Sequence, residues 1–146
     1  MLSGFVLAAT SLELVMIGGG LYEQMVVDPV WPKRPDVIQP SKGGIRRGRF
    51  WIVAHSLFEL TLIGSLILAW SAPPLRTWLL LALASHAITR IWSFGYFIPK
   101  ALAFETAGTV DEAAARRWTG MSRFRFPLEV ITCVFMFEAL WIVWHL

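Results

Sequence analysis

The sequence predicts an all-α fold, which is an integral membrane bundle of four antiparallel helices. Residues 1–146 are expected to form a single domain. Its 146 residues are 56% hydrophobic and only 16% charged, whereas soluble domains carry about 25% charged residues. The apolar residues gather in four long runs, each of about the 20 residues that a helix needs to cross a bilayer. None of these runs alternates polar and apolar residues as a membrane β-barrel does.

The first and second runs are separated by a long connection. The predicted spans cover residues 3–27, 50–70, 75–98 and 126–145. No signal-peptide cleavage site follows a basic start, so the first span is expected to be retained. The connection over residues 28–49 contains four prolines and the pair Gly43 and Gly44, which predict an irregular surface loop.

The remaining two connections are of different kinds. A tight turn at residues 71–74, which contains two prolines, joins the second span to the third and makes them an antiparallel pair. Residues 99–125 form a second long loop. Within it, residues 111–118 predict a short amphipathic helix that Thr109 or Asp111 caps.

The basic residues predict the orientation of the chain. Of 13 Lys and Arg residues, eleven fall in the two long connections, and the opposite end carries only Arg76. Basic loops remain on the cytoplasmic side, so both long loops are predicted to be cytoplasmic and both termini outside. There the basic residues would contact anionic lipid headgroups. They flank spans and do not line one soluble face, which argues against a nucleic-acid partner.

Ionisable residues within the apolar spans are the candidate functional residues. A charge at the bilayer centre costs roughly 2.5–3.5 kcal/mol, so these side chains are expected to turn inward around a polar cavity. Glu13 and Glu138 are predicted near mid-membrane. Glu138 follows Glu129 by nine residues, so one of these two is expected to face an oligomer partner, another polar contact or lipid. The set expected to converge in the cytoplasmic half comprises Glu23, His55, Glu59, His86, Arg90 and Glu129.

Two pairs at a spacing of four residues indicate a possible reaction. His55 and Glu59 share a helix face, so Glu59 would hold the His55 imidazole in one tautomer for proton abstraction. A simple interhelical hydrogen bond is the alternative. His86 and Arg90 also share a face, and Arg90 would anchor a phenolate, enolate or carboxylate, or only neutralise a nearby glutamate.

Other residues complete the predicted site. The catalytic set is His55, Glu59, His86 and Arg90, and the substrate-binding set is Tyr22, Glu23, Trp92, Tyr96 and Glu129. No cofactor is required for this chemistry. The side chains of His55, Glu59, His86 and Glu23 are also donor types that iron, manganese or zinc accepts, so a divalent metal is the alternative.

Residues 20–31, which read Gly-Leu-Tyr-Glu-Gln-Met-Val-Val-Asp-Pro-Val-Trp, resemble small four-span proteins related to the anthrone oxygenases. Residues 90–99, together with Trp118 and Arg123, are similar to the end of the third helix and the following segment of bacterial relatives. The resemblance covers the helix plan of the whole chain and about two dozen residues in detail. It implies oxidation of aromatic polyketide anthrones without a cofactor.

A second resemblance is to the trimeric membrane glutathione transferases and their eicosanoid-forming relatives. Arg90, followed by Gly95 and Tyr96, is similar to their third helix, which would imply glutathione as cofactor. The second helix of that family carries an Arg, then an Asn and a Glu. Here the corresponding segment has His55 and Glu59 and lacks the Asn.

These observations predict a small membrane enzyme that removes a proton from a lipophilic, aromatic or polyketide-like substrate. Oxygenation, isomerisation or cyclisation would follow. A homo-oligomer is expected, because a lone bundle of this size leaves polar faces to cover. The alternatives are a non-catalytic lipophile-binding or helper subunit and a glutathione-dependent membrane transferase.

Overall fold

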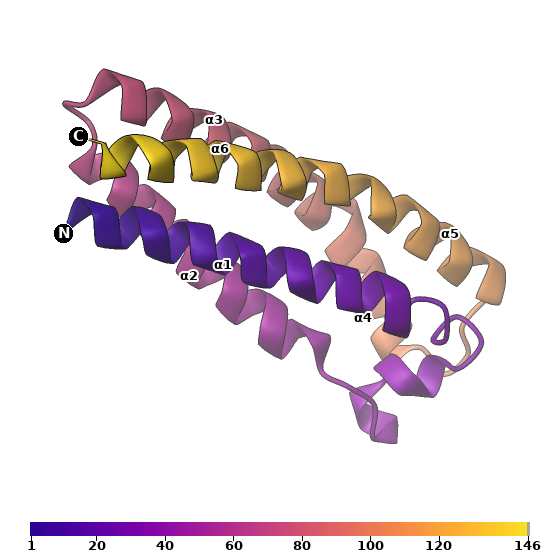
Figure 1. Ribbon diagram of the computed structural model, residues 1–146. Coiled ribbons are helices and arrows are strands. Elements are labelled where there is room, and N and C mark those ends of the chain that lie inside the picture. Colours follow the sequence, from indigo (N-terminus) through magenta and orange to yellow (C-terminus); the bar gives the residue numbers. More distant parts are fainter. Residues whose placement is uncertain (146) are drawn as a thin grey trace.

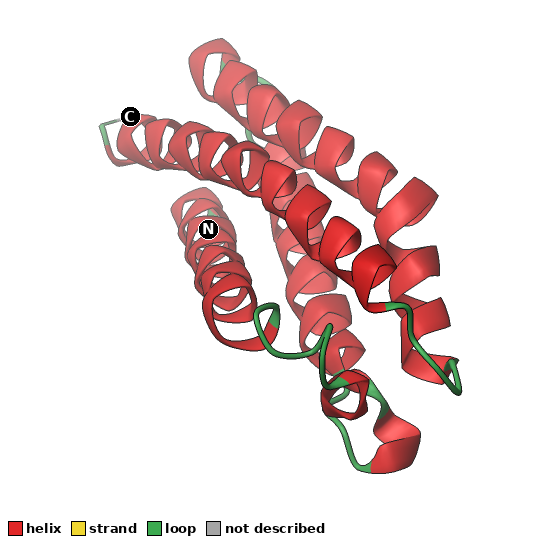
Figure 2. Ribbon diagram, turned by 90° about the vertical axis from the view of Figure 1, so that its right-hand side faces the viewer, coloured by secondary structure: helices red, strands yellow, loops and turns green. Residues whose placement is uncertain are grey.

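The computed structural model describes residues 1–145, and these residues form helices joined by turns and short loops (Figures 1 and 2). The predicted all-α class is confirmed, and no strand occurs within the described residues. The long helices are α1 (Leu2–Tyr22), α2 (Arg47–Leu68), α3 (Pro73–Trp92) and α6 (Phe126–Trp144), and the shorter ones are α4 (Ile98–Thr106) and α5 (Glu112–Ser122).

Two of the long helices end in π-helical turns. One turn over Glu23–Val27 extends α1, and another over Ser93–Phe97 joins α3 to α4. A 3₁₀ turn over Arg123–Arg125 likewise joins α5 to α6. The chain therefore crosses the molecule four times, which agrees with the four predicted runs.

The second predicted loop is mostly helical. The third run was expected to end at residue 98, before a proline, but the chain continues as α4 to Thr106. Pro99 lies in the first turn of α4, where a missing N–H costs little because that group has no partner within a helix. The expected short helix is present as α5, and Asp111 caps it by accepting a hydrogen bond from the Ala113 N–H at 2.9 Å.

The first loop is less irregular than its prolines suggested. It contains two short 3₁₀ helices, Pro35–Ile38 and Pro40–Lys42, and each begins with a proline. The second ends at Gly43, whose φ of 85° is in the left-handed region that favours glycine. The loop lies at the end of the bundle opposite the two termini (Figure 1).

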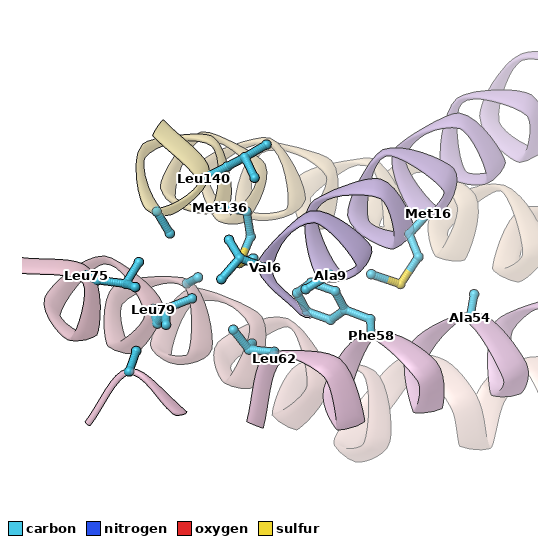
Figure 3. Packing of buried hydrophobic residues seen from close by; sticks show 13 residues of the cluster. Val6, Ala9, Met16, Ala54, Phe58, Leu62, Leu75, Leu79, Met136 and Leu140 are labelled. Atoms are coloured by element: carbon cyan, nitrogen blue, oxygen red, sulfur yellow. The ribbon is translucent and has the colours of Figure 1, made fainter. Parts of the chain in front are cut away.

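The four long segments pack in the order α2, α1, α6, α3. α1 lies against both α2 and α6, and α3 lies mainly against α6. The antiparallel direction of α2 and α3 is confirmed, but these two helices have few contacts with each other, because each packs on a different neighbour. Figure 3 shows Phe58 of α2 close to Ala9 of α1, and Met136 of α6 close to Val6.

Three of the helices among residues 1–145 are long and apolar enough to cross a membrane: Leu2–Val27, Arg47–Leu68 and Glu112–Trp144. The third predicted span does not belong to this set. α3 is more polar because its buried residues include Ser85, His86 and Thr89, and Arg90 follows directly.

Arg47 connects four parts of the chain at the loop end of the bundle. Its Nη1 lies 3.0 Å from Glu23 and its Nη2 lies 3.1 Å from Glu105. Its guanidinium carbon also lies 5.8 Å from the Trp31 ring and 5.5 Å from the Trp118 ring. Only 8% of the Arg47 side chain is exposed, so the ion pairs are shielded from water and anchor the start of α2.

We expect the change Arg47→Met to destabilise the protein by about 3 kcal/mol, because it leaves two largely buried carboxylates without their cation. The thermal unfolding of the purified protein in detergent measures the effect. Arg49→Met is the matched control, because Arg49 is exposed and surface changes stay within about 0.5 kcal/mol. Equal unfolding temperatures for the two variants would contradict the structural role of Arg47.

Candidate functional site

Glu59 of α2 and two residues of α3 form an ion-paired cluster. The Oε1 atom of Glu59 lies 2.8 Å from Nε of Arg90 and 3.2 Å from Nε2 of His86. His86 is buried, whereas the side chains of Glu59 and Arg90 remain 35% and 20% exposed. The cluster therefore has one buried member, His86, and two members that reach the surface, Glu59 and Arg90.

His55 lies next to this cluster, one helical turn before Glu59. Its ring centroid is 5.6 Å from that of His86, and it stacks on the Trp51 ring at 5.6 Å with an interplanar angle of 27°. Its Nδ1 atom is buried and has no hydrogen-bond partner among the described residues. An imidazole nitrogen in this state is able to accept a proton or bind a metal ion.

The pairing of these groups differs from the expectation in one respect. Glu59 was expected to orient His55 on its own helix, but its carboxylate bonds to His86 on the neighbouring helix. The reason is the position of Arg90, one turn after His86, because its cation attracts the carboxylate across to α3. The oriented imidazole is therefore that of His86, and the unpartnered one is that of His55.

Glu23 and Glu129 do not join this cluster but line a separate small polar cavity between α1, α2 and α6. Its volume is about 30 Å³, and its wall also includes Gln24, Asp28, Trp51 and Arg125. Such a volume holds one or two water molecules. Trp51 links the two places, since its indole N–H donates to Glu23 at 2.8 Å while its ring stacks on His55.

The remaining substrate-binding candidates lie elsewhere. Tyr22 is 61% exposed on the outside of the bundle. The Tyr96 hydroxyl donates to the Met121 sulfur at 3.4 Å. Trp92 packs on Phe97, with their ring centroids 5.3 Å apart. Trp92 and Tyr96 belong to an apolar cluster at the loop end of the molecule, so neither of them is near His55.

Glu129 and Glu138 have different surroundings, as their spacing of nine residues predicted. Glu138 is exposed on the outside of α6, whereas Glu129 faces the polar cavity. Glu13 is fully buried in α1, and neither of its carboxyl oxygens has a hydrogen-bond partner among the described residues.

Two arginines with a structural role were missed because they were counted as loop charges. Arg47 begins α2, and Arg125 donates to the hydroxyls of Ser93 and Ser122 at 2.8 and 2.7 Å. A signal for Arg47 was present in the sequence. Arg47, Trp51, His55 and Glu59 recur every four residues, a spacing that places each side chain next to the following one on the surface of a helix.

Three of the four candidate metal ligands come together. One donor atom each from His55, Glu59 and His86 lies within 4.8 Å of the other two. Glu23 is not part of this group, because Arg47 and Trp51 occupy its two oxygens. Two histidines and one carboxylate are a ligand set that divalent iron and zinc accept.

No family model, curated protein or solved structure matches this chain. The two family resemblances therefore stay predictions. The arrangement of the side chains is the basis for any functional proposal.

Asp28 is the buried acid at the loop end of the small polar cavity. It accepts a hydrogen bond from the Trp31 indole at 3.0 Å and is 4% exposed. Burial raises its pKa from the ordinary value of 3.8 to about 6, although the hydrogen bond from Trp31 acts in the opposite direction. A raised pKa in the folded state means that protonation of Asp28 favours folding.

We therefore expect Asp28 to make stability depend on pH. Its contribution is complete below its unfolded pKa of 3.8 and is lost as the pH rises through about 6, by up to about 3 kcal/mol. In Asp28→Asn the amide oxygen still accepts from Trp31, and this pH dependence should disappear. Thermal unfolding between about pH 4 and pH 7 measures it.

Asp36→Asn is the control for that measurement. The Asp36 side chain is 43% exposed, and the hydrogen bond from Arg34 lowers its pKa, so this variant should keep the slope of the wild type over the same pH range. An unchanged slope in Asp28→Asn would show that Asp28 does not titrate there.

Proposed function

We propose that this chain is a multi-pass membrane protein that takes a lipophilic substrate from the bilayer and removes a proton from it at His55, Glu59, His86 and Arg90. The observation that carries the proposal is the unpartnered Nδ1 of His55 beside the ion-paired group of Glu59, His86 and Arg90. Such a group combines a free proton acceptor with a fixed cation.

The three apolar helices and the position of α3 support the proposal of four membrane crossings. α3 is joined to α2 by a tight turn near the two termini and runs to the loop end, in parallel with the bundle (Figure 1). A segment placed in this way would cross the same layer as its neighbours, and its polar residues would be covered by α6.

The proposed orientation places the loop end in the cytoplasm and both termini outside. Eleven of the 13 basic residues belong to the segments at the loop end, and basic residues accumulate on the cytoplasmic side. Anionic headgroups would neutralise those that are exposed. Self-association is also part of the proposal, because Glu138 lies on the outer face of an apolar helix and would find a polar partner there.

Because His55 Nδ1 is buried, the proposed reaction requires the bundle to open beside this side chain. His55 Nδ1 then accepts a proton from an acidic C–H or O–H bond of the substrate. The electron pair of that bond moves to an oxygen of the substrate, and the enolate or phenolate pairs with Arg90. Glu59 positions the Arg90 guanidinium through their ion pair, and His86 contacts the same oxygen of Glu59. A site of low dielectric strengthens this stabilisation.

The partial exposure of Glu59 and Arg90 supports entry from the lipid. The exposed parts of these two side chains would face the acyl chains. The carbanion would then react with molecular oxygen, which dissolves in lipid, or be protonated at another carbon in an isomerisation or cyclisation. An aromatic or polyketide-like substrate is the proposed class.

The exchange of the C10 protons of anthrone with solvent deuterium, measured without oxygen near pH 6, tests the proton step. We expect His55→Ala to slow the catalysed exchange about 100-fold or more, because a general base contributes at least this factor. Arg90→Gln should slow it as well. His145→Ala is the matched control and should exchange at the rate of the wild type, because His145 lies at the far end of α6.

Two results would contradict the proposal. One is exchange at the wild-type rate by folded His55→Ala and Arg90→Gln proteins. The other is exchange by the wild type that is no faster than in empty membranes, which would favour a non-catalytic role for the cluster.

A divalent metal site is the second candidate, and the closeness of the donor atoms of His55, Glu59 and His86 favours it. In this case the histidine nitrogens would bind the ion and would not accept the proton. Arg90 would have to release Glu59 in part, since both would compete for one carboxylate.

Titration of the purified protein with Co²⁺ distinguishes the two candidates. If the metal site exists, visible absorption bands appear in the wild type and in His145→Ala and are absent from His55→Ala and His86→Ala. If the bands are absent from all four proteins, or present in all four, the three residues do not form a metal site.

A further inference from the structure

The end of α1 and the start of α2 form a second and larger cavity, which is open at the surface. Its volume is about 350 Å³, which lies within the range of small-molecule sites. Most of its wall is apolar. The lining includes Gly19, Ile45, Arg46, Arg47, Phe50 and Trp51.

One aromatic side chain separates this cavity from His55. Trp51 lines the cavity, and its ring stacks on the His55 imidazole at 5.6 Å. Glu23 fixes the indole by accepting its N–H at 2.8 Å. A molecule in the cavity is therefore one side chain away from the proposed proton acceptor.

The charges at the cavity favour an anion. Arg47 is already paired with Glu23 and Glu105, so its charge is not free for a ligand. Arg46 is exposed and has no ion-pair partner among residues 1–145, so it adds a positive charge at the mouth. A carboxylate placed there would gain a charge-assisted hydrogen bond.

The walls suit an aromatic body. The Phe50 and Trp51 rings meet edge to face with centroids 4.9 Å apart, and such rings bind other aromatic groups well. Gly19 gives room for the Phe50 ring, because a side chain at this position would collide with it.

We infer that this cavity binds a lipophilic carboxylate, with its apolar body against Phe50 and Trp51 and its carboxylate at Arg46. Trp51 then lies between the bound molecule and His55. The inference deepens the proposed function. The reaction of the bound molecule depends on that function, whereas its binding in the cavity does not. The binding alone is tested by experiments without turnover.

The probe is 9-anthracenecarboxylate, whose fluorescence anisotropy is measured with the protein in nanodiscs of zwitterionic lipid and with empty nanodiscs. Gly19→Leu displaces the Phe50 ring, which forms part of the wall of the cavity, and we expect it to weaken binding at least about tenfold, a change of about 1.4 kcal/mol. Gly18→Leu is the matched control, because the space beside Gly18 is open and both variants replace a glycine within α1 by leucine. Ile45→Trp fills the cavity from its exposed side and should also weaken binding.

The role of Arg46 is tested with a pair of probes. Arg46→Gln should weaken binding of the carboxylate up to about fivefold, as expected for an exposed ion pair, and leave the uncharged 9-anthracenemethanol unaffected. Arg49→Gln is the control, because Arg49 is an exposed arginine that does not line the cavity.

Equal binding by Gly18→Leu and Gly19→Leu would overturn the inference. So would the absence of saturable binding above that of empty nanodiscs, which would indicate that an acyl chain of the bilayer fills the cavity. His55→Ala should bind the probe as the wild type does. If His55→Ala binds the probe and still exchanges anthrone protons at full rate, the proposed function fails and the binding site stands.

Discussion

The paired Arg47 side chain is the interaction on which the arrangement of the polar residues depends. A guanidinium that is nine-tenths buried must be neutralised, and Glu23 and Glu105 do this from two different segments. Trp31 and Trp118 cover it from two more. The start of α2 is thereby tied to the end of α1 and to the helices of the second loop.

Once this point is fixed, the geometry of α2 places the rest of its polar face. Trp51, His55 and Glu59 follow Arg47 at intervals of four residues, so each side chain lies beside the next and the row winds around α2 by about 40° per step. Glu23 contacts both Arg47 and Trp51, and Glu59 reaches α3. The polar groups thus form a column along the inside of an apolar bundle, where each charge has a partner close by. His55 Nδ1 is an exception in this column and for that reason carries the functional proposal.

Much of the fold was predictable because it follows from local patterns. Apolar runs of helical length give four long helices, and Asp111 is a capping residue before a helical segment. Pro99 was misleading, because a proline ends a helix in its interior but is tolerated in the first turn, and the π-helical turn before it starts a new helix there. The separation of Glu23 and Glu129 from the histidines was also not predictable, because depth along a helix does not specify which neighbour a side chain faces.

The sequence by itself determined the helical class, the number of long helices and the identity of the ionisable residues in apolar segments, because these depend on composition and on periodicity within one segment. Only the tertiary structure decided that Glu59 pairs with His86 and Arg90, that His55 keeps a free nitrogen and that Arg47 is buried. These features depend on the order α2, α1, α6, α3 and on the rotation of each helix about its axis. Both are set by side-chain packing between segments that are far apart in the chain.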